Sequence, residues 1–95
     1  MPAHDPAVHL HHAFVRDGHL TSLPRREPMI VATCDFLVRR FEVGREYAER
    51  EVNELLRNDA PDHATLRRLL VDRGYLRRTA GRYRRVTATD EEPAG

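Results

Sequence analysis

The side chains best suited to chemistry in this sequence are histidines near its start. Four of them crowd the first segment: His4, His9, His11 and His12. On a helix, His9 and His12 could lie along one side with Asp5 and hold a metal ion. The sequence lacks the CxxC or HExxH spacing that would strengthen this interpretation. We therefore expect a leader whose histidines do little, with no metal and no cofactor; metal sensing is the minor alternative.

Other catalytic residue types do not form a recognisable set. Tyr47, Glu49 and Glu51 could be imagined as an acid–base group, but glutamates at a helix start have a simpler role in interacting with the helix dipole. The sequence contains no nucleophile elbow, phosphate-binding glycine loop or paired-carboxylate arrangement. We expect a protein that is not an enzyme.

Arginine supplies all sixteen basic residues, and its distribution is uneven. GC-rich codon usage would explain the absence of lysine, although arginine also suits phosphate and guanine edges. Residues 42–62 hold seven acids against three arginines, whereas residues 63–86 hold eight arginines against Asp72 alone. The overall charge of +1 hides this asymmetry. Such segregation indicates a polyanionic partner, or ion pairs between neighbouring helices.

Length and composition limit the structures that can carry these residues. A chain of 95 residues allows one domain with a thin core, which excludes a large enzyme with a deep pocket. The single cysteine, Cys34, cannot form an intrachain disulfide. Apolar runs stay well short of the roughly 18–20 residues of a membrane span. We expect a soluble, cytoplasmic protein with no membrane partner.

The N-terminal part, residues 1–27, is expected to be a leader and an arm. Asp5-Pro6 is a plausible cap and first turn for a short helix over about 6–16. An extended piece over 19–23 follows.

The central domain is expected to span residues 28–86 and to open with a helix over about 28–41. Its predicted inward face consists of Ile30, Cys34, Leu37, Val38 and Phe41. Met29 and Phe36 lie on the opposite side, where a simple surface helix is polar. Either the N-terminal segment or a second subunit should cover them, and we take them as the predicted interface of a homodimer.

Three further elements complete the expected domain. In order they are a helix from about Tyr47 to Arg57, a helix over 63–73 capped by Asp62, and a β-hairpin around Thr79-Ala80-Gly81. Residues 87–95 are expected to be a flexible acidic tail.

This order predicts a winged helix-turn-helix, an α+β and mostly helical fold. The break between its second and third helices is about four residues, as that motif needs. The helix over 63–73 would enter the major groove of double-stranded DNA, and the hairpin would be the wing on the backbone. The arginine-rich segment coincides with these two elements, which favours DNA binding.

Residues for DNA contact follow from the helical wheel. With Leu66 inward, Arg68 points most directly outward and Thr65 flanks it, whereas Arg67 and His63 are secondary candidates. Val71 also faces outward. The wing adds the remaining candidates: Arg77, Arg78, Arg82, Arg84 and Arg85.

Both arginine groups have a simpler interpretation. Arg67 and Arg68 could form ion pairs with Glu51 or Glu54 on the preceding helix. The wing arginines could be a solvated edge that prevents strand-to-strand aggregation.

Three segments resemble a known family. Residues 41–53 are similar to its pattern F-E-x-G-R-x-Y-x-E-x-E-V-N, and residues 62–78 to D-x-x-x-L-R-R-x-L-V-D-x-G-x-L-x-R. Residues 17–24 resemble its opening D-G-R-L-x-x-L-P, with His19 where arginine is common. The family is the bacterial domain of unknown function 2087, and the resemblance covers residues 14–86. Its members occur alone or behind a helix-turn-helix domain in ArsR-like regulators, which implies work connected with transcription.

Two functions remain open. The first is a small winged-helix DNA-binding regulator that acts as a homodimer. The second is a protein-interaction, dimerisation or ligand-sensing module of a transcriptional regulatory system without DNA binding of its own, with a regulatory protein as partner.

Overall fold

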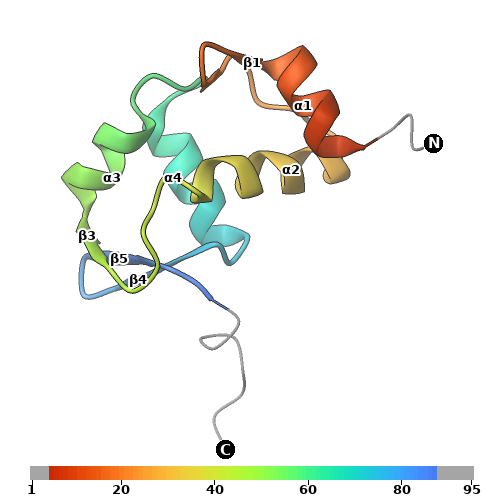
Figure 1. Cartoon of the computed structure of the whole chain (residues 1–95). Coiled ribbons are helices and arrows are strands. Elements are labelled where there is room, and N and C mark those ends of the chain that lie inside the picture. Colours follow the sequence, from red (N-terminus) through yellow and green to blue (C-terminus); the bar gives the residue numbers. More distant parts are fainter. Residues whose placement is uncertain (1–4, 88–95) are drawn as a thin grey trace, which may run out of the picture.

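Four helices and two small antiparallel sheets make up the structure, a computed structural model that describes residues 5–87 (Figure 1). The expectation of an α+β, mostly helical chain is confirmed. His4 and all of the predicted tail except Thr87 lie outside the described residues. Within residues 5–87, no helix is long and apolar enough to cross a membrane.

The N-terminal segment contains a helix and a hairpin. Helix α1 (Pro6–Phe14) begins as predicted, because the Asp5 carboxylate accepts a hydrogen bond from the Ala7 backbone N–H at 3.0 Å. It ends earlier than residue 16, since Val15–Arg16 form strand β1, which pairs with strand β2 (His19–Leu20). Asp17 and Gly18 between them have φ of 55° and 81°, as a type I′ hairpin turn requires. The predicted extended piece over 19–23 is therefore reduced to one short strand.

Helix α2 (Glu27–Val38) is shorter than the predicted 28–41. Cys34 and Leu37 are fully buried on its inward face, as expected. Beyond Val38 the chain turns, and the Phe41 N–H donates to the Val38 carbonyl at 3.0 Å. Phe41 reaches the core from this turn, 1% exposed, rather than from the helix.

The segment around Tyr47 corrects the sequence prediction. Tyr47 lies in strand β3 (Glu46–Ala48), and helix α3 (Glu49–Leu56) starts only after it. A Glu51 carboxylate oxygen accepts a hydrogen bond from the Ala48 backbone N–H at 2.8 Å, which satisfies one donor at the helix start. Tyr47 pairs across the sheet with Tyr83, a partner far along the chain.

The second half follows the predicted order. Residues 57–62 lead into helix α4 (His63–Asp72), a longer connection than the expected break of about four. Strands β4 (Leu76–Thr79) and β5 (Arg82–Arg85) form the predicted hairpin. Strand β5 lies in the middle of the sheet, whose order is β3-β5-β4.

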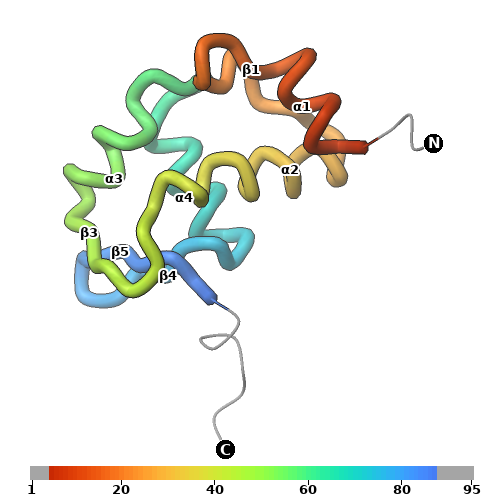
Figure 2. Tube along the Cα trace, in the orientation of Figure 1, coloured from red at the N-terminus to blue at the C-terminus, as the bar shows by residue number. Residues whose placement is uncertain are grey.

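One hydrophobic core joins all of these elements. Leu37 of α2, Val52 of α3 and Leu66 of α4 are each 0% exposed. Leu10 and Leu20 of the N-terminal segment are also buried in the same cluster. The trace in Figure 2 runs from α1 beside α2, at one end of the molecule, to the β4–β5 hairpin at the other.

Candidate nucleic-acid interface

The outer face of α4 carries Arg68 and Thr65, as the helical wheel predicts. Both are exposed, while Leu66 between them is buried. The Arg68 guanidinium makes no hydrogen bond or ion pair with any other residue of the described chain 5–87. The Thr65 hydroxyl donates to an Asp62 carboxylate oxygen at 3.1 Å, and the Thr65 backbone N–H donates to the other at 2.8 Å. Arg68 is therefore the available cation on this face.

Arg67 is engaged within the protein. It is half-buried, donates a hydrogen bond to the Asn53 side-chain oxygen and lies 3.7 Å from a Glu49 carboxylate oxygen. The expected pairing with the preceding helix is correct, but Glu49 takes the place of Glu51 or Glu54. Those two are occupied: Glu51 by Arg45 at 3.1 Å and Glu54 by Arg57 at 3.3 Å.

Two other α4 residues lie nearer the core than expected. Val71 is half-buried: it packs against the core and also lines the surface groove that contains Arg68, so its predicted outward position holds only in part. His63 is also half-buried, and its Nδ1 atom is enclosed without a hydrogen-bond partner.

The hairpin arginines divide into two groups. Arg77, Arg78 and Arg82 are exposed. Arg84 and Arg85 are half-buried, and Arg85 donates to the Phe41 carbonyl at 3.1 Å, which ties β5 to the turn after α2. The hairpin therefore presents its first three arginines to solvent.

Contacts of the exposed hairpin arginines differ. The Arg78 guanidinium lies 5.9 Å from the Tyr83 ring centroid, and it forms no ion pair with residues 5–87. Arg82 lies 3.9 Å from a Glu46 carboxylate oxygen, a long and exposed pair that stabilises little.

A groove of about 380 Å³ joins α4 to the hairpin. It is lined by Glu49, Arg67, Arg68, Val71, Asp72, Arg78 and Tyr83. Glu49, one of the lining residues, accepts a hydrogen bond from the Tyr83 hydroxyl at 3.1 Å and pairs with Arg67. Arg68 and Arg78 thus line one groove from two elements, and neither is neutralised by an acid of the described chain.

The predicted interface residues are partly covered by the protein's own N-terminal segment. Phe36 is half-buried, with the His11 ring edge-on at 5.4 Å and the Arg40 guanidinium 5.3 Å from its ring centroid. Met29 is half-buried against the core. Phe36 was expected to be covered by either the N-terminal segment or a second subunit, and the structure shows the N-terminal segment in contact with it.

Candidate metal and acid–base residues are dispersed or structurally engaged. Within residues 5–87, no three His, Cys, Asp or Glu side chains gather in a way that could hold a metal ion. Burial raises the pKa of the Cys34 thiol to about 11. The Tyr47 hydroxyl accepts a hydrogen bond from the Glu42 N–H at 2.7 Å. The Ala48 N–H holds the pKa of Glu51 below its usual range.

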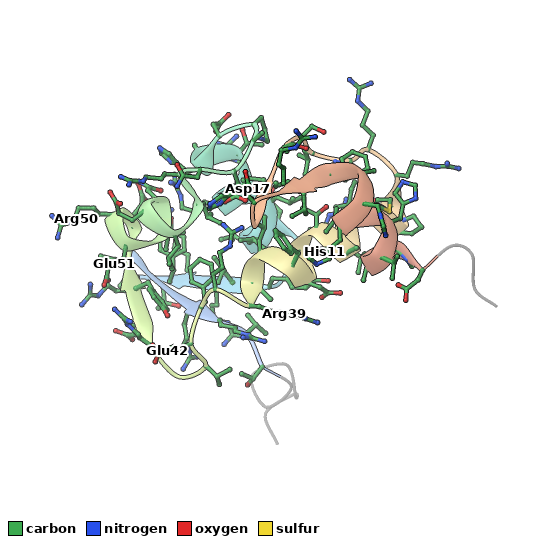
Figure 3. All side chains as sticks on the ribbon, turned by 45° about the horizontal axis from the view of Figure 1, so that its top comes forward. His11, Asp17, Arg39, Glu42, Arg50 and Glu51 are labelled. Carbon is green, nitrogen blue, oxygen red and sulfur yellow. The ribbon has the colours of Figure 1, made fainter. Side chains whose placement is uncertain are left out.

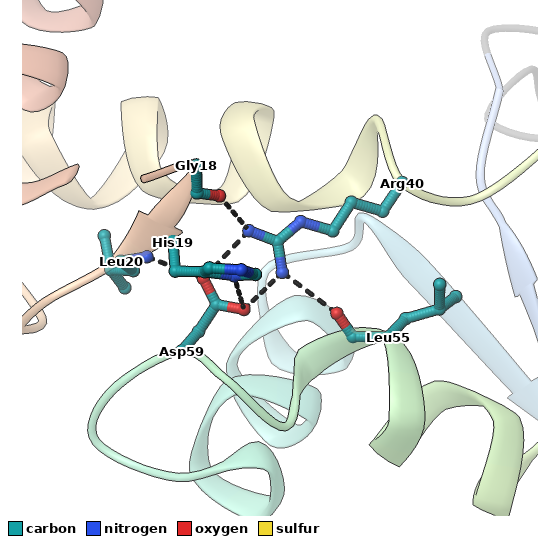
Figure 4. A network of polar contacts seen from close by, with 6 residues as sticks. All are labelled: Gly18, His19, Leu20, Arg40, Leu55 and Asp59. Carbon is teal, nitrogen blue, oxygen red and sulfur yellow. Dashed lines mark hydrogen bonds and ion pairs between the residues drawn. The ribbon is translucent and has the colours of Figure 1, made fainter. Parts of the chain in front are cut away.

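A buried ion pair was missed by sequence analysis, which treated Asp59 as one acid among several. Its side chain is fully buried and accepts hydrogen bonds from both terminal guanidinium nitrogens of Arg40, one of them at 2.8 Å (Figure 4). The Asp59 carboxylate also accepts from the Leu20 N–H at 2.7 Å, and Arg40 donates to the Leu55 and Gly18 carbonyls. This network positions the helix pair α3–α4 against α2 and the β1–β2 hairpin.

Comparison with known proteins identifies the family and nothing closer. The model of the family described as "Uncharacterized protein conserved in bacteria (DUF2087)" matches residues 19–85. No curated protein and no solved structure matches the chain. The match spans most of the sequence, from β2 to the last residue of β5, and the chain therefore belongs to the DUF2087 family.

Proposed function

We propose that this protein is a small DNA-binding regulator with a winged helix-turn-helix fold. In this proposal α3 and α4 are the helix-turn-helix pair, and the β4–β5 hairpin that directly follows is the wing. Helix α4 enters the major groove of double-stranded DNA, and the hairpin lies along the adjacent backbone.

The observation that carries the proposal is the groove shared by Arg68 of α4 and Arg78 of β4. Both guanidinium groups lack an acidic partner within residues 5–87, whereas the neighbouring Arg67 is compensated by Glu49. Two uncompensated arginines facing one groove favour a phosphate or a base edge as ligand. The exposed Arg77 and Arg82 extend the positive surface along the hairpin.

Roles follow from position. Arg68 lies on the outer face of α4 and is the candidate for a guanine or phosphate contact. Thr65 flanks it, one turn nearer the start of the helix. Arg77, Arg78 and Arg82 are candidates for phosphate contacts, which fix orientation without reading sequence.

Fluorescence anisotropy of a labelled random-sequence duplex, titrated with the protein over a salt series, tests the proposal. We expect binding at about 50 mM salt and a logarithmic slope of affinity against salt that corresponds to several phosphates, about 0.9 for each. Absence of binding at that salt concentration would overturn the proposal. The alternative of a protein-interaction module would then take its place.

A further inference from the structure

A second surface lies between α1 and α2, at the opposite end of the molecule from the hairpin (Figure 2). It is a groove of about 410 Å³. Its apolar lining includes Ala7, Leu10, Pro28, Val31, Ala32 and Phe36. Covering these apolar side chains would remove them from water, which favours a partner at this groove.

One strongly exposed valine lies in this groove. Only three large apolar side chains within residues 5–87 are strongly exposed: Val8, Val31 and Val43. Val31 is 43% exposed and lines the groove, whereas Val8, on α1, is 53% exposed and is not part of the groove lining. Val43 is 62% exposed in the turn between α2 and β3, away from the groove. Its position makes it a matched control.

Charges at the ends of the groove are opposite in sign. Asp5 is exposed at the start of α1, and Arg39 is exposed just after the end of α2. The contact of His11 with Phe36 shows that the later part of α1 lies beside the later part of α2. Asp5 and Arg39 therefore occupy opposite ends of the groove. Figure 3 labels His11 of α1 and Arg39, which directly follows α2.

These charges are available to a partner. The Arg39 guanidinium pairs with no acid of residues 5–87, and Asp5 uses one carboxylate oxygen for the Ala7 N–H. Asp35, which also lines the groove, is a second exposed acid and lies one helical turn before Arg39.

We infer that a second copy of this chain occupies the groove across a twofold axis. A twofold interface uses the same patch on both subunits, so an acid at one end and a base at the other complement themselves when the patches meet head to tail. Arg39 of each copy then faces Asp5 of the partner subunit, and the two Val31 side chains are covered between them. This dimer leaves α4 and the hairpin of both copies exposed, and it does not depend on DNA binding.

Size-exclusion chromatography with light scattering over a concentration series tests the inference. We expect the full chain to have twice the 11.0 kDa mass of one copy. Val31→Glu should return it to one copy, while Val43→Glu, which adds the same charge at an exposed valine elsewhere, should remain dimeric. A wild-type protein of single mass at every concentration, or a dimer that survives Val31→Glu, would overturn the inference.

Exchanging the charges of Asp5 and Arg39 distinguishes a lost dimer contact from misfolding of the Val31→Glu variant. Arg39→Asp places two acids opposite each other and should weaken the dimer at least about tenfold, because like charges across an interface are costly. Adding Asp5→Arg to the same chain reverses both ends and should restore dimerisation. Equal dimer affinity in wild type and Arg39→Asp, or no recovery in the double variant when circular dichroism shows native helix content, would contradict the proposed pairing.

Discussion

Arg67 and Arg68 are neighbours in sequence but differ in environment, because successive residues of a helix point about 100° apart. Arg67 turns toward α3 and is held by Asn53 and Glu49, whereas Arg68 turns to solvent. Side-chain direction thus assigns the first arginine to stability and makes the second available for binding.

This difference predicts unequal effects on stability. Arg67→Ala should lower the free energy of unfolding by about 1–2 kcal/mol, because a charge-assisted hydrogen bond is lost and Asn53 is left without its donor. Arg68→Ala should change it by less than about 0.5 kcal/mol, as is usual at the surface. Urea denaturation followed by circular dichroism measures both values. Equal losses would show that Arg68 has a structural partner.

Cys34 should be chemically inert in the folded protein. Burial raises its thiol pKa to about 11, so the nucleophilic thiolate is scarce at pH 8. The stabilising effect of the neutral thiol is complete below the ordinary pKa of 9.0 and declines as pH rises through about 11. Iodoacetamide labelling at pH 8 should be slow in buffer and fast in urea. Equal rates would place the thiol at the surface.

Element boundaries show what local sequence can predict. The 63–73 helix has a cap at Asp62 and a glycine at its end, and the β4–β5 hairpin has a glycine turn; the structure contains both elements. Strand β3 was missed because its three residues pair only with β5, a partner distant in sequence. Tyr47 was instead predicted as the start of the helix that follows.

In the candidate site, too, local sequence predicts the features within one helix but not the contacts between separate elements. The exposure of Arg68 follows from helical period alone and was predicted. Two hydrogen bonds depend on how separate elements pack: from Arg85 to the Phe41 carbonyl and from Arg40 to the Asp59 carboxylate. No spacing within the sequence encodes them.

Helix α4 should depend on its cap in a pH-sensitive way. Hydrogen bonds from Thr65 hold the pKa of the Asp62 carboxyl below its usual 3.8, so the ionised cap stabilises the helix above that pH. This contribution is lost as pH falls through the lowered pKa. Asp62→Ala should lower the melting temperature at pH 7, and Asp62→Asn should retain part of the cap. Equal melting temperatures for wild type and the alanine variant would contradict this role.

At the scale of the whole molecule, the Arg40–Asp59 pair connects parts of the chain that the helices alone do not join. It links the β1–β2 hairpin, the end of α2 and the connection before α4 (Figure 4). The Ala60 N–H also donates to the Leu20 carbonyl at 2.9 Å, which adds a backbone bond at the same junction. The N-terminal segment is thereby fixed to the helix pair proposed to bind DNA.

Removing one member of the Arg40–Asp59 pair should strongly lower the free energy of unfolding. Asp59→Asn leaves Arg40 partly buried without a counter-charge, and we expect a loss of about 3–5 kcal/mol in the free energy of unfolding. Arg57→Ala is the control, because it breaks the exposed pair with Glu54 and should cost less than about 1 kcal/mol. Chemical denaturation of both variants makes the comparison. Similar small losses would mean that Asp59 does not secure the junction.

Paired arginine variants test whether DNA binds across α4 and the hairpin. Arg68→Ala with Arg78→Ala removes the two uncompensated cations of the groove, and Arg25→Ala with Arg26→Ala removes two exposed cations before α2. Anisotropy over a salt series should show the first variant with weaker binding and a salt slope reduced by about 2, since each phosphate contact contributes about 0.9. The second variant should behave as wild type. An unchanged salt slope in the Arg68/Arg78 variant, or an equal loss of DNA affinity in both variants, would show that DNA does not bind at this groove.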